Sequence, residues 1–204
     1  MTAPHQTLAS RRILVYGVTG SGKSTLARRI AEATGVPLYL VDEHTWRPGW
    51  APVPEDEQRA RFEEICARDE WVLDTAYKTW LDVPLARTQL LVALDYPRLV
   101  SLGRLLRRTA MRIVDRRPIC NGNYETLRQA LSSDSIVAWH FRSFSRKRRQ
   151  MRAWAVHPPG PVVLLFRHPR DADRWLSTLS PRPGADGPGH AAGRGTLAVD
   201  EVEC

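Results

Sequence analysis

Short apolar runs alternate along the chain with longer segments of helical periodicity. Each run is bounded by polar or small residues, which predicts five strands. They cover residues 13–16, 38–41, 71–74, 90–94 and 162–166. Apolar residues that recur every three or four positions predict helices at 25–34, 55–68, 97–115 and 124–131, a long helix that ends near 155, and a last one at 171–179. Strands that alternate with helices in this way predict an α/β fold, a parallel sheet with helices on both faces.

Capping and helix-breaking residues mark where some of these elements begin and end. Gly35 is a natural cap at the end of the helix at 25–34. Ser133 or Asp134 is the candidate N-cap of the long helix. The prolines and the glycine within 43–54 predict a loop without regular structure.

One loop carries the strongest chemical signal, because it fits the phosphate-binding pattern G-x-x-x-x-G-K-[ST] at every fixed position. This loop, called the P-loop below, consists of Gly17, Val18, Thr19, Gly20, Ser21, Gly22, Lys23, Ser24 and Thr25. It follows a predicted strand and opens a predicted helix. In such a loop the backbone N–H groups point at phosphate oxygens, and the helix N-terminus adds partial positive charge. We therefore expect the P-loop to bind ATP, with Lys23 on the β- and γ-phosphates and Ser24 on Mg²⁺.

Length and composition limit the domain organisation. With 204 residues, 43% of them hydrophobic, the chain suits one compact domain, predicted at 11–180. A flexible N-terminus is expected at 1–10, and the Gly-, Pro- and Ala-rich segment 181–204 is expected to be a disordered tail. The first ten residues carry no apolar run after a basic start, and no run of about 18 apolar residues is present, so neither a signal peptide nor a membrane span is expected. Three widely spaced cysteines are typical of reduced thiols in a cytoplasmic protein.

The positive charge is concentrated in one quarter of the chain. Residues 104–152 include 13 basic and 3 acidic residues, whereas the whole chain has a net charge of +8. Such a segment suggests a site for polyanions, which are either the phosphates of a nucleotide or the backbone of a nucleic acid. The sequence leaves the oligomeric state open.

Three aspartates lie at the carboxyl ends of predicted strands and are candidates for chemistry at that edge of the sheet. Asp74 is the first candidate for the carboxylate that supports Mg²⁺ near Ser24, and Asp95 is its rival. Asp42 is placed to orient or deprotonate an acceptor hydroxyl. The alternative for each of them is an ordinary cap of the following turn.

Arginines recur every four residues at Arg104, Arg108, Arg112 and Arg116, which predicts a basic ridge along one helix. Like charges at this spacing repel each other, so the ridge suggests a bound anion. Planar guanidinium groups suit the charge of a transferring phosphoryl group, and Arg104, Arg108 and Arg112 are therefore candidate catalytic residues. A solvated helix face is the alternative.

A second basic cluster is interleaved with aromatic residues. It contains Arg142, Arg146, Lys147, Arg148, Arg149 and Arg152, beside Trp139, Phe141, Phe144 and Trp154. Such a mixture can stack bases and follow a phosphate backbone. The spacing of the aromatic residues favours instead the packing face of a helix.

The P-loop and several further segments resemble the small P-loop kinases of the adenylate kinase-like type, and within them a bacterial topology-modulation-like group. The resemblance covers about residues 11–179 and rests on the P-loop, 41–50, 71–77, 94–98 and Arg104 with the basic segment after it. It implies the sheet order 2-3-1-4-5, an acceptor-binding segment at 43–70 and a basic, Arg-rich helical lid within 104–152.

The resemblance also implies roles for individual residues. Arg104 and Arg108 look like the lid arginines of such kinases, and Arg142 or Arg146 would be the nucleotide-binding arginine beyond the lid. The chain departs from adenylate kinases after Asp74, where Thr75, Ala76 and Tyr77 replace Gly-Phe-Pro and no arginine follows. AMP is therefore not carried over as the acceptor.

The sequence as a whole predicts a cytoplasmic, Mg·ATP-dependent kinase that transfers the γ-phosphoryl group to a small acceptor, which is a nucleotide or another hydroxylated metabolite. Lys23 and Asp42 join the three arginines as candidate catalytic residues. One alternative is a nucleic-acid-binding ATPase or polynucleotide end-kinase that grips its substrate through 104–152. Another is a regulatory nucleotide-binding module without turnover.

Overall fold

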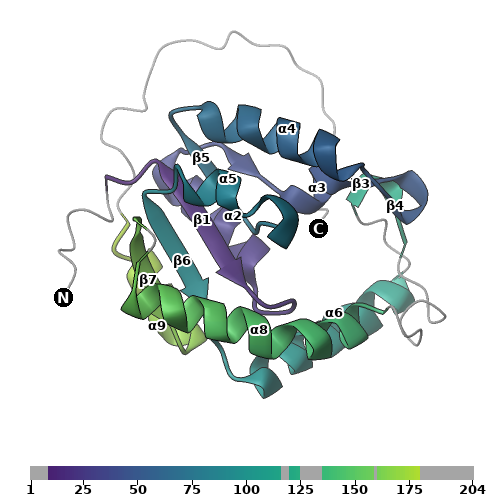
Figure 1. The fold of residues 1–204 in the computed structure, drawn as a ribbon. Helices are drawn as coiled ribbons and strands as arrows, with labels where there is room; N and C mark the ends of the chain where they lie inside the picture. The colour runs from purple at the N-terminus through teal and green to yellow at the C-terminus, as the bar shows by residue number, and fades with distance from the viewer. Residues whose placement is uncertain (1–8, 116–119, 125–134, 159, 180–204) are drawn as a thin grey trace, which may run out of the picture.

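A five-stranded parallel sheet forms the centre of the molecule (Figure 1). The computed structural model describes residues 9–115, 120–124, 135–158 and 160–179. The strands are β1 (Arg12–Gly17), β2 (Leu38–Tyr39), β5 (Trp71–Leu73), β6 (Leu90–Leu94) and β7 (Val162–Phe166). Their order, β2-β5-β1-β6-β7, confirms the predicted order 2-3-1-4-5 and the predicted α/β class.

Some predicted features lie outside the described residues. They are the tail at 181–204, the first eight residues of the N-terminus at 1–10, Arg116, the candidate caps Ser133 and Asp134, and all but the first residue of the helix at 124–131.

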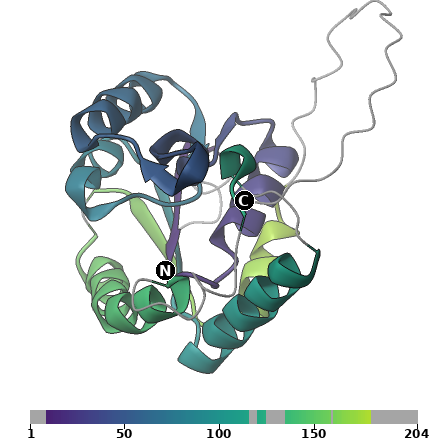
Figure 2. The ribbon, with the colours of Figure 1, turned by 90° about the vertical axis from the view of Figure 1, so that its right-hand side faces the viewer.

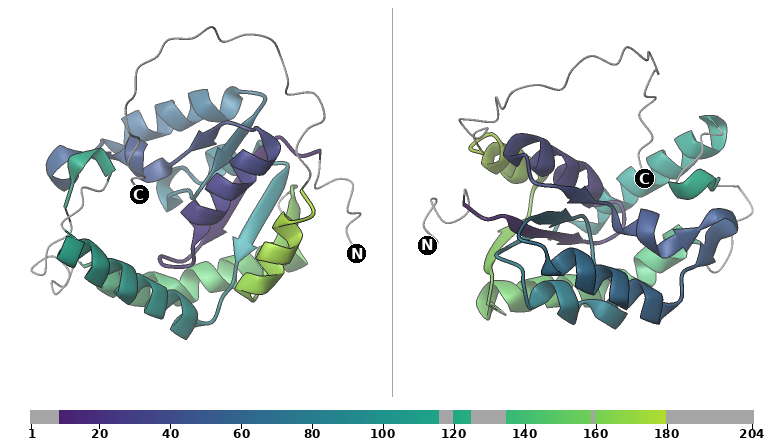
Figure 3. Two further views of the ribbon diagram at one scale, coloured as in Figure 1. Left: turned by 180° about the vertical axis from the view of Figure 1, so that it is seen from behind. Right: turned by 90° about the horizontal axis from the view of Figure 1, so that it is seen from above.

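Helices cover both faces of the sheet because successive strand residues point to opposite sides. On one face, Leu14 and Tyr16 pack with α4 (Glu55–Ala67) and α8 (Ile136–Val156). On the other face, Ile13 and Val15 pack with α2 (Lys23–Thr34) and α9 (Pro169–Leu176). Figure 2 shows the sheet between these two layers, and Figure 3 shows α2 and α9 from behind.

The segment predicted to lack regular structure is ordered into several short elements. β2 ends at Tyr39, and α3 (Val41–Thr45) follows it, so Asp42 lies on a short helix. β3 (Trp46–Arg47) and β4 (Ala51–Pro52) then form an antiparallel pair around η1 (Pro48–Trp50). The prediction was wrong because Gly49 (φ 80°) makes the turn, while the prolines lie at its ends and in an edge strand.

Two elements before β6 were not predicted from the pattern, namely η2 (Lys78–Trp80) and α5 (Asp82–Leu85). They bury Trp80, whose ring stacks on Phe62 with 4.0 Å between centroids and whose Nε1 donates to Gln58. They therefore fix α4 against the sheet.

α6 (Arg98–Asp115) packs through an unexpected face. Of the apolar positions that predicted this helix, Leu99 is 83% and Leu106 48% exposed, whereas Leu102 and Ile113 are half-buried. The buried residues are instead Ser101, Leu105 and Thr109. Small side chains face inward because α6 approaches the P-loop backbone closely: a Cβ on Gly20 would lie 2.3 Å from the carbonyl oxygen of Ser101.

α8 begins after Ser135, whose hydroxyl accepts a hydrogen bond from the N–H of Ala138, so the cap is not one of the two predicted residues. The packing interpretation of its aromatic residues holds for Phe144 and Trp154, which are buried. It is wrong for Trp139 and Phe141, which are about half exposed. No helix in the described ranges is long and apolar enough to cross a membrane.

Candidate nucleotide and acceptor site

The P-loop connects β1 to α2 at the carboxyl edge of the sheet. Gly20 (φ 78°) and Gly22 (φ 87°) adopt backbone conformations that favour glycine, and Gly22 is the N-cap of α2. The first turn of α2 carries no acidic side chain. The free N–H groups of this turn therefore face an environment suited to an anion.

The loop residues fit a bound triphosphate on observations of this structure. The Ser21 hydroxyl is buried, and no hydrogen-bond partner for it exists among the described residues. The guanidinium of Arg104 reaches the loop from α6, donates to the Ser21 carbonyl at 3.2 Å and lies over the Tyr96 ring. An unpaired buried hydroxyl and an adjacent cation are what a phosphate oxygen would use.

Asp74, which directly follows β5, contacts the predicted metal ligand of the P-loop. The Ser24 hydroxyl donates to its Oδ2 at 2.6 Å, and the N–H of Val41 donates to its Oδ1 at 2.9 Å. Burial raises the pKa of the Asp74 carboxyl, and the charge of Lys23 acts in the opposite direction. The pair of Ser24 and Asp74 could hold a divalent cation together with phosphate oxygens.

The rival carboxylate, Asp95, is engaged elsewhere. Its two oxygens accept hydrogen bonds from Arg148 at 2.7 Å and Arg152 at 2.8 Å, both on α8. The Asp95 side chain is completely buried, so these ion pairs tie α8 to the end of β6. This arrangement favours Asp74 over Asp95 for a metal, and the metal role of Asp74 stays a prediction.

Asp42 is held by a half-buried tyrosine that was not singled out from the sequence. The Tyr77 hydroxyl donates to Asp42 Oδ1 at 2.6 Å and accepts hydrogen bonds from Thr45 Oγ1 at 3.3 Å and Trp46 Nε1 at 3.1 Å. Burial and the adjacent Asp42 carboxylate raise the pKa of Tyr77, so it remains a donor at physiological pH. No sequence motif connects residues 35 positions apart, which is why the pattern missed this pair.

Segment 120–124 contacts the acceptor-binding segment through two asparagines. Asn121 Nδ2 donates to the carbonyls of Glu43 at 2.9 Å and Trp46 at 2.6 Å. Asn123 accepts from the N–H of Trp50 at 2.9 Å and donates to the Arg47 carbonyl at 3.2 Å. We call Asn121 and Asn123 the asparagine clasp. Nothing in the sequence run Asn-Gly-Asn indicates these partners.

The predicted arginines are placed in different ways. Arg104 contacts the P-loop as described, Arg108 has a buried Nε without a partner among the described residues, and Arg112 is half-buried. Arg142 and Arg146 are exposed on the outer side of α8, where Arg146 lies over the Trp139 ring. Their predicted roles stay predictions.

Two further residues of α8 contact the P-loop and were not assigned to the site from the sequence. His140 Nδ1 bonds to the Thr19 carbonyl at 3.0 Å, and Lys147 Nζ donates to the Gly17 carbonyl at 3.3 Å. Both occupy the helical face that also carries the buried residues Met151 and Trp154. That spacing is the signal that could have found them.

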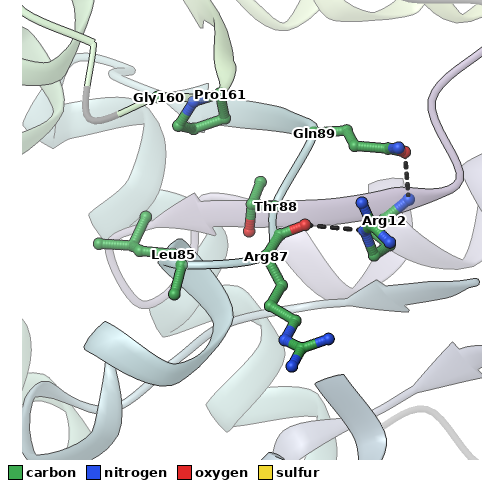
Figure 4. Close-up of a pocket in the computed structure, with 8 residues that line it drawn as sticks. Arg12, Leu85, Arg87, Thr88, Gln89, Gly160 and Pro161 are labelled. Atoms are coloured by element: carbon green, nitrogen blue, oxygen red, sulfur yellow. Dashed lines mark hydrogen bonds between the residues drawn. The ribbon is translucent and has the colours of Figure 1, made fainter. Parts of the chain in front are cut away.

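A depression of about 490 Å³ lies at the opposite edge of the sheet (Figure 4). Its lining includes Arg12, Thr88, Gln89 and Pro161, which stand at the amino ends of β1, β6 and β7. Arg12 donates there to the carbonyl of Arg87 and to Gln89. No residue of the P-loop lines this depression, so it is separate from the candidate site.

Comparison with known proteins supports the fold. Residues 13–73 match the model of the ATPase family associated with various cellular activities (AAA). No match is found among proteins of curated function. Among solved structures, the shikimate kinase from Acinetobacter baumannii in complex with shikimate is 15% identical, with a TM-score of 0.52 over 87% of this chain and 95% of that one.

Two other structures are similar at lower TM-scores. A gluconokinase from Sinorhizobium meliloti 1021 is 20% identical, with a TM-score of 0.48 over 83% of this chain and 93% of that one. A deoxyadenosine kinase from M. mycoides with bound dCTP is 11% identical, with a TM-score of 0.46 over 81% and 96%. The sheet order, the P-loop and the shikimate kinase likeness together show that the chain has the α/β fold of P-loop kinases.

Proposed function

We propose that this protein is an Mg·ATP-dependent phosphotransferase that moves the γ-phosphoryl group of ATP to a hydroxyl of a small acceptor. The observation that carries this proposal is the 2.6 Å contact between Ser24 of the P-loop and the buried Asp74. It places a hydroxyl and a carboxylate at the mouth of the phosphate loop, as a magnesium site for phosphoryl transfer requires. The P-loop kinase fold supports the same reaction class.

The donor half of the site, defined here as the P-loop with Asp74 and Arg104, would hold the nucleotide. Lys23 and the N–H groups at the start of α2 would bind phosphate oxygens, and Arg104 would add a guanidinium from α6. Ser24 and Asp74 would hold the magnesium ion, which when bound neutralises charge on the phosphates. Phosphoryl transfer needs mainly such positioning and charge stabilisation.

The acceptor half, defined here as Asp42, Tyr77, Trp46 and the asparagine clasp, would hold the hydroxyl. Because Tyr77 occupies Oδ1 of Asp42, Oδ2 is left to accept a hydrogen bond from the acceptor. The acceptor oxygen would bond to the γ-phosphorus, the bond from that phosphorus to the bridging oxygen of ADP would break, and the hydroxyl proton would pass to Asp42. Trp46 and Trp50, with 5.8 Å between centroids, give this half an aromatic lining.

The proposal is tested by a screen for phosphate acceptance from labelled ATP. The panel contains nucleoside monophosphates, nucleosides and small hydroxylated metabolites. We expect transfer to at least one of them by the wild type and none by Lys23→Ala. ATP binding without transfer to any member would favour the regulatory module instead, and no nucleotide binding would overturn the proposal.

A second candidate function is binding of single-stranded nucleic acid, and the outer face of α8 favours it. This face contains the exposed Arg142, Arg146 and Arg149 beside the half-exposed Trp139, and α8 has no acidic residue. A guanidinium over an exposed ring is suited to stacking on bases. Binding of a labelled oligonucleotide that weakens steeply with salt would support this function, and no binding at about 0.1 M salt would exclude it.

A further inference from the structure

The basic residues of α8 fall into groups with different partners. Arg142, Arg146 and Arg149 are exposed on the outer face, while Arg148 and Arg152 form ion pairs with Asp95. The remaining basic residue, Lys147, turns inward with His140, Met151 and Trp154. Its side chain is thus the one amine that α8 directs at the P-loop.

The Lys147 amine contacts two uncharged groups. Its Nζ donates to the carbonyl of Gly17 at 3.3 Å and lies 5.0 Å from the centroid of the Tyr16 ring. None of the ion pairs found among the described residues involves Lys147. Burial lowers the pKa of this amine to about 7, and the nearby charge of Lys23 acts in the same direction.

Charged groups from several elements surround the amine. Lys23 of α2 and Arg146 of α8 disfavour its protonation, whereas Asp42 of α3 and Asp74 after β5 favour it. Tyr16 of β1 contributes a neutral ring whose hydroxyl donates to Gln150. Two lysines from different elements, Lys23 and Lys147, therefore lie at the P-loop, and the charge of Asp42 acts on the second of them.

An ammonium group in this position is costly as long as no anion is bound. It has three donors, and the Gly17 carbonyl accepts from one of them. Desolvation and the second lysine both oppose its charge. A phosphate between the two lysines would reverse this balance, because it would supply acceptors and negative charge together.

We propose that Lys147 is a phosphate-binding residue of this site, which binds a phosphoryl oxygen of the nucleotide from α8 on the acceptor side of the P-loop. The proposal rests on the nucleotide site of the proposed function. It assigns to Lys147 the inward contact that the sequence had led us to expect from Arg142 or Arg146, both of which point to solvent.

A measurable consequence is that nucleotide binding takes up a proton. Above neutral pH the amine of the empty protein is largely uncharged, and a bound phosphate raises its pKa so that it becomes protonated. This proton comes from the solvent, and the buffer replaces it. Affinity for the nucleotide therefore declines as the pH rises above about 7.

The test is isothermal titration calorimetry of the full chain with a nonhydrolysable Mg·ATP analogue, at pH 8 in buffers of different ionisation enthalpy. The wild type is expected to take up a large fraction of one proton. Lys147→Met should lower the affinity by about 10- to 100-fold, as expected for a lost charged hydrogen bond, and abolish the uptake. Lys147→Arg should retain the affinity without the uptake, because arginine is always charged.

Arg170→Met is the control, since it removes an exposed positive charge from α9. It should leave both the affinity and the proton count unchanged. Lys147→Met should also unfold at a higher temperature than the empty wild type, because a costly, half-buried amine is gone. If that variant does not fold, Lys147→Gln serves in the same titration.

The outcomes separate this inference from the proposed function. A wild type that binds no nucleotide overturns the proposed function itself. A wild type that binds the nucleotide while Lys147→Met or Lys147→Gln binds it equally well, with the same proton count, overturns the role of Lys147 alone.

Discussion

The donor and acceptor halves of the site are built in different ways. The core of the donor half is one loop of consecutive residues, so the backbone between β1 and α2 places Lys23 and Ser24 together, and Asp74 and Arg104 are added from other elements. The acceptor half joins residues far apart in the chain, with Tyr77 bonded to Asp42 and Asn121 bonded to the Glu43 carbonyl. Local backbone geometry thus defines one half, and long-range side-chain contacts define the other.

Loss of the P-loop lysine should have the largest effect on phosphoryl transfer, because it removes a positive charge from the donor half. For Lys23→Ala we expect phosphoryl transfer to fall by about 10³-fold or more, together with weaker nucleotide binding. Steady-state transfer and calorimetry with Mg·ATP measure the two effects. Arg170→Ala, an exposed charge on α9, is the control and should behave like the wild type. Unchanged transfer by Lys23→Ala would contradict the assignment of the donor half.

Substitution of Asp42, the carboxylate of the acceptor half, should separate the effect on transfer from the effect on nucleotide binding. For Asp42→Asn we expect transfer to fall by about 10²- to 10⁴-fold, which is the range for a lost general base. Mg·ATP affinity should stay within about threefold of the wild type, because Asp42 belongs to the acceptor half. Equal losses of binding and transfer would show that the halves are not separable.

Removal of the hydroxyl that holds Asp42 should have an intermediate effect. Tyr77→Phe keeps the ring but removes the hydroxyl that holds Asp42 and accepts from Trp46 Nε1, while Thr45 Oγ1 retains the carbonyl of Val41 as an acceptor. We expect the free energy of unfolding to fall by about 1–3 kcal/mol and transfer to fall by about tenfold, mainly through kcat. Tyr124→Phe, at an exposed tyrosine, is the matched control for both measurements. A positioning role also predicts a shifted pH profile of transfer, which a purely structural role would not produce.

Loosening of the asparagine clasp should have a smaller effect, confined to the acceptor. Asn123→Ala removes two hydrogen bonds to segment 43–54, each worth about 1 kcal/mol. We expect the KM for the acceptor to rise by about three- to tenfold, while the KM for Mg·ATP is unchanged. A rise in the KM for Mg·ATP instead would assign the clasp to the donor half.

The smallest expected effect is the pH dependence of the contact between α8 and the P-loop. Burial lowers the pKa of His140 below its usual value of 6.5, so the unfolded chain binds a proton at this residue more readily than the folded protein does. The free energy of unfolding should therefore decline as the pH falls below about 6.5. His140→Asn should reduce this decline in melting curves recorded between pH 7.5 and 5. Burial also lowers the pKa of His44, which is half-buried, so part of the decline should remain.

The sequence predicted the parts of the molecule that depend on local pattern. The strands, the P-loop and the carboxylate after β5 could be found because apolar runs and glycine spacing determine them. The strand order was instead implied by the resemblance to small P-loop kinases. The packed face of α6 could not be found, because Ser101 and Leu105 approach Gly20 only in the folded protein. Tyr77 and the asparagine clasp were missed for a related reason. Their partners become neighbours only after folding.

The γ-phosphoryl transfer itself is tested most directly with ATP labelled either at the γ- or at the α-phosphate. We predict that, with Mg²⁺ present, the wild type passes the γ-label and not the α-label to a small hydroxylated acceptor, and that Asp42→Asn binds Mg·ATP but passes neither. The account would be contradicted by transfer of the α-label, or by Asp42→Asn passing the γ-label as fast as the wild type.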